Sequence, residues 1–174
     1  KQAPKDPQSA HLEKLQTQAL AAAGNAVVIT DPEGNIIWAN RSFSKYTGYS
    51  FDEALGKNPS DLLKSGHQPK EFYEEMWAVI SRGEIWQGEI VNRRKDGSVY
   101  PEEMTITPIF NEEGVITHYI AIKQDVSEKK NLQKMFLRAQ RLESVGTLAS
   151  GVAHDLNNVL SPIVMSSDLL MVQV

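Results

Sequence analysis

Short apolar runs separated by turn-forming residues dominate the chain between residues 25 and 126. Alternating apolar and polar positions favour strands, and apolar positions three or four residues apart favour helices. We therefore predict strands over Asn25–Thr30, Asn35–Asn40, Ile85–Lys95, Ser98–Phe110 and Val115–Gln124, and helices over Arg41–Gly48, Phe51–Gly56 and Pro69–Arg82. Two strands, a set of small helices and three more strands are typical of an α+β domain in which helices cover one face of an antiparallel sheet.

The pattern changes after residue 127, where one long helix is predicted. No proline occurs from Glu128 to Gly151, and the apolar residues approximate a heptad. They are Leu132, Met135 or Phe136, Ala139, Leu142, Val145 and Ala149. Because so narrow a stripe cannot bury itself on a lone helix, we expect a coiled coil with a second copy of the chain, and therefore a homodimer. The alternative is a helix that folds back on its own domain.

The segment Ser144 to Ile163 places a histidine on the polar side of the continuing helix. Its apolar residues recur at helical spacing and leave His154 off the apolar stripe. An unperturbed imidazole has a pKa of about 6.5, so its neutral, nucleophilic form is available at physiological pH. Asp155 follows directly, and Asn158 lies four residues on, on the same helix face. This arrangement suits phosphoryl chemistry on the imidazole.

The residues GVAHDLNN, which end at Asn158, resemble the H-box of sensor histidine kinases. The resemblance implies that His154 takes the γ-phosphoryl group of ATP and passes it to an aspartate on a response regulator receiver domain. Asp155 would orient the imidazole and act as a general base, and Asn158 would position water for dephosphorylation of that partner. The chain has no glycine-rich phosphate loop followed by lysine, so we expect ATP to bind to a separate domain beyond Val174. The alternative is an ordinary amphipathic helix with a chance histidine.

The central domain resembles PAS domains in the segments IIWANRSFSKYTGYS, WQGE and NRRKDG and in the closing DVS triplet. The resemblance implies a PAS fold, with a five-stranded antiparallel sheet and small helices on one face. In similar proteins the triplet joins the last strand to the output helix, so Asp125 and Ser127 are candidates for coupling the two. Ser127 also suits the N-cap of that helix, and both interpretations can hold together.

We accordingly divide the chain into four parts. They are an N-terminal amphipathic helix (1–24), the PAS sensor domain (25–126), a coiled-coil signalling linker (127–143) and the truncated first helix of a dimerisation and phosphoacceptor domain (144–174). Strand alternation puts His118 on the same side of the last strand as neighbouring isoleucines, and alignment with the flavin-binding light sensors of the PAS family implies that this side faces outward. We expect the N-terminal helix to cover that face with Leu12, Leu15, Ala19 and Ala22.

The inward face of the sheet carries the candidate ligand pocket. Alignment with the flavin-binding light sensors of the PAS family implies that Asn92, Glu102 and Lys123 point into it, and Trp86 is assigned to the same pocket. Asn92 keeps a residue type that contacts flavin, whereas Glu102 and Lys123 replace amides. The alternative is that Glu102 and Lys123 pair across adjacent strands and fill the pocket.

Two cofactors are compatible with this pocket at the level of sequence. The segment NPSDLLKSGHQPKEFYEEMW resembles PAS domains of redox sensors that hold non-covalent flavin, which makes FAD a candidate. Haem is a weaker candidate, with His67 as the nearest axial ligand, because a histidine in a loop flanked by glycine and proline is usually solvated. The chain has no cysteine, which excludes cysteine-based photochemistry, disulfides and thiolate metal sites.

Composition narrows the partners and the class of protein. The chain has 174 residues and a net charge of −4 without basic clusters, which argues against nucleic acid and anionic membranes as main partners. No run reaches the roughly 20 apolar residues of a membrane span. We interpret the chain as a cytoplasmic fragment of a sensor histidine kinase. The second hypothesis is a PAS ligand-sensing or dimerisation module without phosphotransfer.

Overall fold

The computed structural model describes residues 7–143, 151–152 and 156. By the contacts within it, the chain divides into two units, Lys1–Ser127 and Glu128–Val174. The first contains the five strands of the described residues, and the second contains most of the described helix that follows them.

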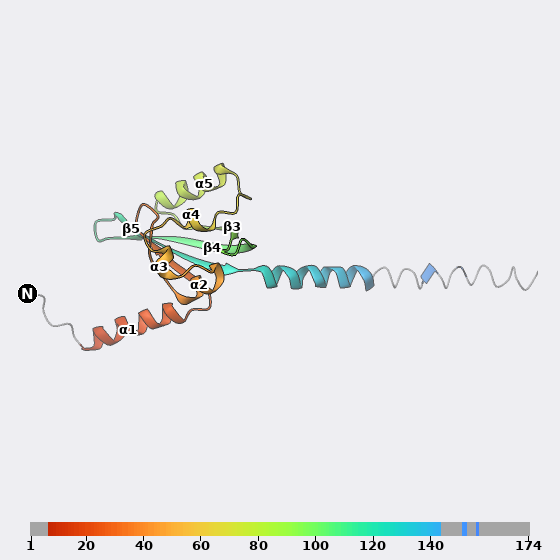
Figure 1. The fold of residues 1–174 in the computed structure, drawn as a ribbon, viewed down its shortest axis with the longest axis horizontal. Coiled ribbons are helices and arrows are strands. Elements are labelled where there is room, and N and C mark those ends of the chain that lie inside the picture. Colours follow the sequence, from red (N-terminus) through yellow and green to blue (C-terminus); the bar gives the residue numbers. More distant parts are fainter. Residues whose placement is uncertain (1–6, 144–150, 153–155, 157–174) are drawn as a thin grey trace, which may run out of the picture. The chain divides into compact units, whose positions relative to one another are not determined.

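An antiparallel sheet of five strands in the order β2-β1-β5-β4-β3 is the framework of the first unit (Figure 1). The strands are β1 (Ala26–Thr30), β2 (Ile36–Ala39), β3 (Trp86–Arg93), β4 (Val99–Phe110) and β5 (Ile116–Asp125). Each predicted strand end lies within two residues of the observed one. The predicted fold class, an α+β domain with a five-stranded antiparallel sheet, is confirmed. The pairing of β1 with β5 joins the first and last parts of the domain in one sheet, whose inner face packs on a single core.

The helices are α1 (Pro7–Ala22), α2 (Arg41–Thr47), α3 (Phe51–Ala54), α4 (Pro59–Leu63) and α5 (Lys70–Ser81). Of these, α2 packs on β1, α3 on β2, α4 on β3, and α5 on β3 and β4. The sequence prediction missed α4, because five residues are too few to show helical periodicity. Its start was nevertheless encoded: the Asn58 side chain accepts a hydrogen bond from the Ser60 N–H at 3.0 Å, and Pro59 occupies the first helical position.

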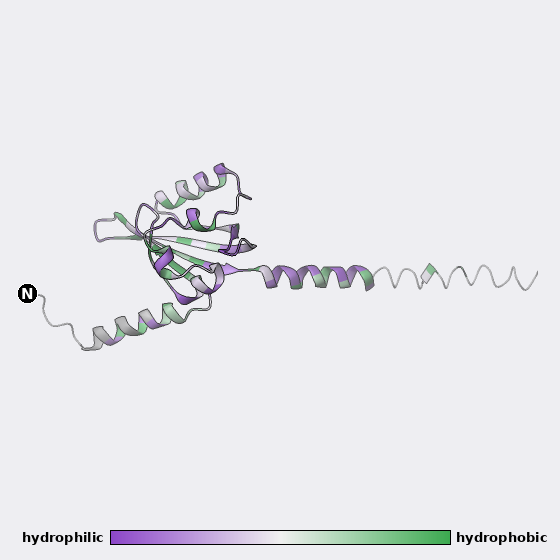
Figure 2. Ribbon diagram, in the orientation of Figure 1, coloured by the Kyte–Doolittle hydropathy of each residue, from purple (hydrophilic) through white to green (hydrophobic). Residues whose placement is uncertain are grey.

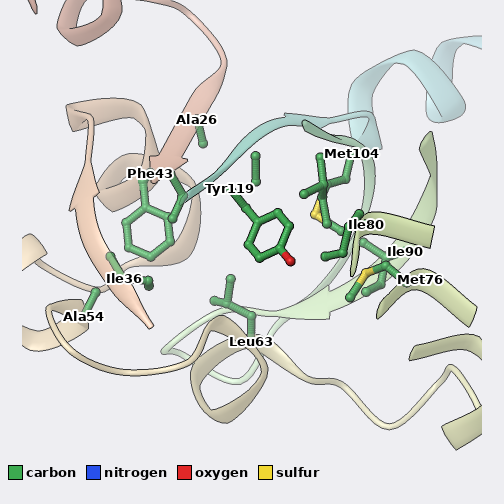
Figure 3. Close-up of a cluster of buried hydrophobic side chains, with 13 residues drawn as sticks. Ala26, Ile36, Phe43, Ala54, Leu63, Met76, Ile80, Ile90, Met104 and Tyr119 are labelled. Atoms are coloured by element: carbon green, nitrogen blue, oxygen red, sulfur yellow. The ribbon is translucent and has the colours of Figure 1, made fainter. Parts of the chain in front are cut away.

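The core lies between the inner face of the sheet and helices α2 to α5. Tyr119 on β5 is its centre: Figure 3 shows its ring between Ile36 and Phe43 on one side and Met76 and Ile80 on the other. The buried cluster consists of Ala26, Val28, Ile36, Phe43, Ala54, Leu63, Met76, Ile80, Ile90, Met104, Ile106, Tyr119 and Ala121. The strand residues among them alternate with residues of the other face, as predicted for Tyr119, Ala121 and Lys123.

The outer face of the sheet is not covered in the way that the sequence suggested. Leu12 and Leu15 of α1 are each 54% exposed, and Ile122 of β5 is 45% exposed. The end of α1 is instead bonded to the start of α2, where the Asn40 side chain donates to the Leu20 carbonyl at 3.1 Å and the Ser42 hydroxyl donates to the Ala23 carbonyl at 2.8 Å. The predicted cover by α1 is therefore wrong for the single chain.

In the second unit the helix that begins at residue 127 continues to residue 143. Apolar and polar residues alternate along it (Figure 2). Leu132, Met135, Phe136 and Leu142 are all more than half exposed. Over the described part of the chain, no helix has the length and apolar character needed to cross a bilayer.

The turn between β1 and β2 yields a test of the packing. Gly34 has a φ of +87°, and a Cβ there would lie 2.7 Å from the Trp77 ring, whereas Gly114 has a φ of +77° with open space around it. Replacing Gly114 by alanine should cost about 1 kcal/mol of unfolding free energy for the left-handed backbone alone. Gly34→Ala should cost about 1–3 kcal/mol more, because the added methyl group must displace the indole.

Denaturant unfolding of the two variants beside the parent chain measures this difference. Equal losses at the two sites would contradict the close contact between Gly34 and Trp77.

Candidate functional site

A cavity of about 90 Å³ lies between the inner face of the sheet and helices α4 and α5. Its walls are largely apolar and come from every layer of the domain, with Val28 from β1, Met104 from β4, Leu63 from α4 and Ile80 from α5. Ser60 and Lys64 also line it and are exposed, so the cavity opens toward solvent beside α4. The sheet side is polar at one end, where Asn92 and Lys123 reach the wall.

Behind this polar end, Glu102 lies at the centre of a buried hydrogen-bond cluster. Its Oε1 accepts from Lys123 Nζ at 2.9 Å and from Asn92 Nδ2 at 3.2 Å, and its Oε2 accepts from the Tyr100 hydroxyl at 3.1 Å. The Lys123 and Glu102 side chains are only 5% and 3% exposed. The predicted alternative of a Glu102–Lys123 pair is confirmed.

Strand register explains how these side chains meet. Glu102 on β4 is opposite Asp125 on β5, and Lys123 is opposite Met104, so the ion pair is diagonal across the two strands. Tyr100 and Glu102 are two residues apart on β4 and therefore point to the same face. Asn92 on β3 is opposite Tyr100. Three adjacent strands thus contribute to one carboxylate site.

A second set of contacts continues from Tyr100 to the end of β5. The Arg94 guanidinium lies 3.9 Å from the centre of the Tyr100 ring, and its Nη2 forms an ion pair with Asp125 Oδ2 at 2.5 Å. The other oxygen of Asp125 accepts the Ser127 backbone N–H at 2.9 Å. Asp125 therefore accepts the backbone N–H of the first residue of the following helix while it is tied to Arg94.

The environment fixes the protonation of two groups in this set. Burial, with the adjacent Glu102 carboxylate, raises the pKa of the Tyr100 phenol, so the hydroxyl remains a donor to Glu102. Burial opposes the ionisation of Asp125, but hydrogen bonds from Ser127 and Arg94 outweigh it and hold the Asp125 pKa below its usual value. The stabilisation from Asp125 is therefore present at neutral pH and is lost as the pH falls through its lowered pKa.

Other predicted site residues lie elsewhere. Trp86 is not among the residues that line the cavity. Its ring lies over Gly88, where an added Cβ would come within 2.6 Å of the indole. The ring also packs edge-on against Phe72, with 5.7 Å between the two ring centres. The absence of a side chain at Gly88 lets the indole turn along its own strand. His67 is exposed, does not line the cavity, and forms a 3.1 Å contact between its Nδ1 and Ser65 Oγ, which suits a solvated loop histidine.

The residues proposed for phosphoryl chemistry, His154, Asp155 and Asn158, lie outside the described residues. Sequence reasoning also missed residues that the structure places at the site. Tyr100 was signalled by its two-residue spacing from Glu102, and Arg94 by its place in the NRRKDG segment. Tyr73 had no such signal, because its position on α5 matters only once α5 is packed over the sheet.

A family model described as a PAS domain matches residues 24–128. The chain belongs to the PAS domain family, and its central part is a PAS sensory domain of the kind found in signal transduction proteins.

Three similar proteins place this domain in context. A nitrogen fixation regulatory protein of Klebsiella oxytoca is 38% identical over 82% of this chain and 27% of its own length. The hybrid signal transduction histidine kinase L of Dictyostelium discoideum is 30% identical over 84% of this chain and 8% of its own length. The solved structure of an RNA-binding light-oxygen-voltage receptor superimposes with a TM-score of 0.67 at 27% identity, covering 83% of this chain and 41% of that one. The chain thus spans about a quarter of the first relative.

The buried ion pair predicts an asymmetric response to substitution. Lys123→Met should cost about 3–5 kcal/mol of unfolding free energy, because it leaves the Glu102 charge buried without a counter-ion. The double variant Glu102→Gln, Lys123→Met should recover part of that loss, since both charges are removed together and the amide oxygen keeps an acceptor for the buried donors Asn92 and Tyr100. Lys70→Met, in the exposed Lys70–Glu74 pair at 2.7 Å, is the control and should leave stability nearly unchanged.

Chemical denaturation of all three variants tests this prediction. A Lys123→Met variant as stable as the Lys70→Met control would show that the pair does not carry a buried charge.

Proposed function

We propose that this chain is the sensory and phosphoacceptor part of a two-component sensor histidine kinase. In this proposal the PAS domain detects a signal and controls the ATP-dependent phosphorylation of His154. The phosphoryl group then passes to an aspartate on the receiver domain of a response regulator. We expect the PAS domain to work in the cytoplasm, where ATP and the response regulator are available.

One observation carries the proposal: contacts run without a break from the cavity to the output helix. Lys123 lines the cavity and binds Glu102, and Glu102 binds Tyr100. Tyr100 lies under Arg94, which binds Asp125, which in turn holds the Ser127 N–H. A change at the cavity wall therefore has a physical route to the start of the helix that precedes His154 in the sequence.

The helix that follows β5 supports the dimer required by this scheme. Leu132, Met135, Phe136 and Leu142 expose large apolar side chains on it. Burial of such side chains against a second helix lowers the free energy. A second copy of the same chain supplies a helix whose apolar residues have the same spacing. We therefore propose a parallel homodimer through this helix. Rotation or sliding within the helix pair would then transmit the signal.

The chemistry proposed for His154 follows from the imidazole itself. A neutral ring nitrogen attacks the γ-phosphorus of ATP, the bond to the bridging oxygen breaks, and ADP leaves as a phosphohistidine forms. Asp155 is assigned to orient the ring and to take up its proton. Asn158 is assigned to hold the water that later dephosphorylates the receiver domain. ATP itself would be bound by a further domain of the whole protein.

Flavin is the ligand suggested by the resemblance to light sensors and redox sensors, but the cavity does not fit it. Ligand pockets in proteins span about 300–1,000 Å³, whereas this cavity measures about 90 Å³. The Glu102–Lys123 ion pair also occupies the two positions at which the light sensors carry amides. We therefore assign no step of signalling to a flavin.

Phosphorylation of the full-length protein tests the main proposal. With ATP labelled in its γ-phosphate, the parent should acquire an acid-labile label, and His154→Gln should acquire none because it has no nucleophilic ring nitrogen. His118→Gln is the matched control and should retain the label, since His118 lies on β5 beside Thr117.

Undiminished labelling of the His154→Gln variant would refute the assignment. Failure of the parent itself to label would instead favour a PAS sensing or dimerisation module without phosphotransfer.

The absorption spectrum of the purified chain tests the exclusion of flavin. After incubation with FAD and desalting, we expect no visible absorption band above that of the untreated protein, because the cavity, at about 90 Å³, is smaller than pockets that hold ligands of that size. One mole of retained flavin per mole of protein would contradict this conclusion and would require the cavity to widen.

A further inference from the structure

The size of the cavity sets an upper bound on its ligand. An engineered protein cavity of about 150 Å³ admits benzene, and this cavity measures about 90 Å³. The part of a ligand that enters it is therefore no larger than a benzene ring. Its walls include Met76, Ile80, Ile90 and Ile106, so most of that ligand must be apolar.

The charges around the cavity favour a ligand without net charge. Lys123 lines the wall, but Glu102 neutralises its ammonium at 2.9 Å. Lys64, the other cation of the lining, is exposed and lies with its Nζ 4.4 Å from the centre of the Tyr73 ring. An ion that entered the cavity would lose its hydration without gaining an unpaired counter-ion.

One polar atom at the cavity lacks a partner. Among the buried side-chain nitrogen and oxygen atoms of the described residues, the Tyr73 hydroxyl is the one without a hydrogen bond. Burial raises the pKa of Tyr73, so the phenol keeps its proton and can donate. Buried hydroxyls are normally paired, because an unpaired one forfeits its hydrogen bond to water. Tyr73 lines the cavity, and a ligand that turns its ring toward the cavity would supply the acceptor that the enclosed hydroxyl lacks.

We propose that the cavity binds a small uncharged organic molecule, no larger than a benzene ring, that is apolar except for one oxygen atom that accepts a hydrogen bond from Tyr73. The inference rests on the proposed sensory function, for which it supplies the class of signal. It places one end of the ligand against α5 and its apolar body against the sheet. Filling the cavity therefore changes the contacts of both α5 and the sheet.

Binding to the purified chain can be measured without any kinase activity. The probes are butanone and the alkene in which a methylene group replaces its carbonyl oxygen, because the two have nearly the same shape and differ in one acceptor. Chemical-shift titration by NMR yields the two dissociation constants. We expect butanone to bind about fivefold more tightly than the alkene, the ratio that one net hydrogen bond supplies.

Tyr73→Phe is the decisive variant, because it removes the donor and keeps the ring. We expect it to abolish the preference for butanone, so that the two dissociation constants agree within twofold. In the ligand-free protein it should raise the midpoint of thermal unfolding, since an unpaired buried hydroxyl is removed. A lowered midpoint would show that Tyr73 already has a partner, and would overturn the inference.

Ala121→Leu locates the binding. Ala121 lines the cavity and is 9% exposed, so a leucine there would fill the space and should abolish binding of both probes. Tyr73→Phe, whose fold is checked by the same spectra, keeps the test decisive if Ala121→Leu does not fold. Unchanged binding to folded Ala121→Leu would place the probes elsewhere and overturn the inference.

The remaining outcomes are also informative. If neither probe binds the parent chain at millimolar concentration, only water enters the cavity and the inference fails, whereas the labelling of His154 is unaffected. If both probes bind equally to the parent, the claim for Tyr73 fails. A protein that binds butanone as expected but never labels at His154 would retain the ligand site and lose the kinase assignment.

Discussion

The buried carboxylate of Glu102 is the constraint on which the inner face of the sheet depends. Ionised groups are costly to remove from water unless they are paired and hydrogen-bonded. Here Lys123 and Asn92 hold one oxygen, and Tyr100 holds the other. These donors come from β3, β4 and β5, so the same contacts that compensate the charge also fix the register of the three strands.

That pairing also determines the character of the cavity. If Lys123 lacked Glu102, the wall would present a free ammonium and favour anions. With the pair closed at 2.9 Å, the wall is polar but neutral, and the rest of the lining is mostly apolar. The second oxygen of Glu102 faces the opposite way, toward Tyr100 and the contacts that lead to Asp125. One side chain thus joins two residues of the cavity wall, Asn92 and Lys123, to the path toward the helix.

The sequence predicted the parts of this arrangement that local pattern determines. Strand ends followed from turns such as Asp96-Gly97, and alternation along β5 put Lys123 on the same face as Tyr119, whereas the resemblance to flavin-binding light sensors indicated that this face is the inner one. It did not predict α4, which is too short for periodicity, or the position of Trp86, which depends on the open space at Gly88. The cover by α1 was also wrong, because the hydrogen bonds from Asn40 and Ser42 that hold its end are set by tertiary contact rather than by pattern.

The size of the cavity also limits the strength of the signal it can carry. The best small ligands gain about 1.5 kcal/mol per non-hydrogen atom, so a molecule of about five such atoms binds with a dissociation constant no lower than a few micromolar. A ligand shifts a conformational equilibrium only by the difference in its affinity for the two states. Contacts to both α5 and the sheet make that difference large for so few atoms, because any state that separates the two walls loses the hydrogen bond from Tyr73. The response of such a sensor therefore depends less on tight binding than on how strongly ligand affinity changes when α5 and the sheet separate.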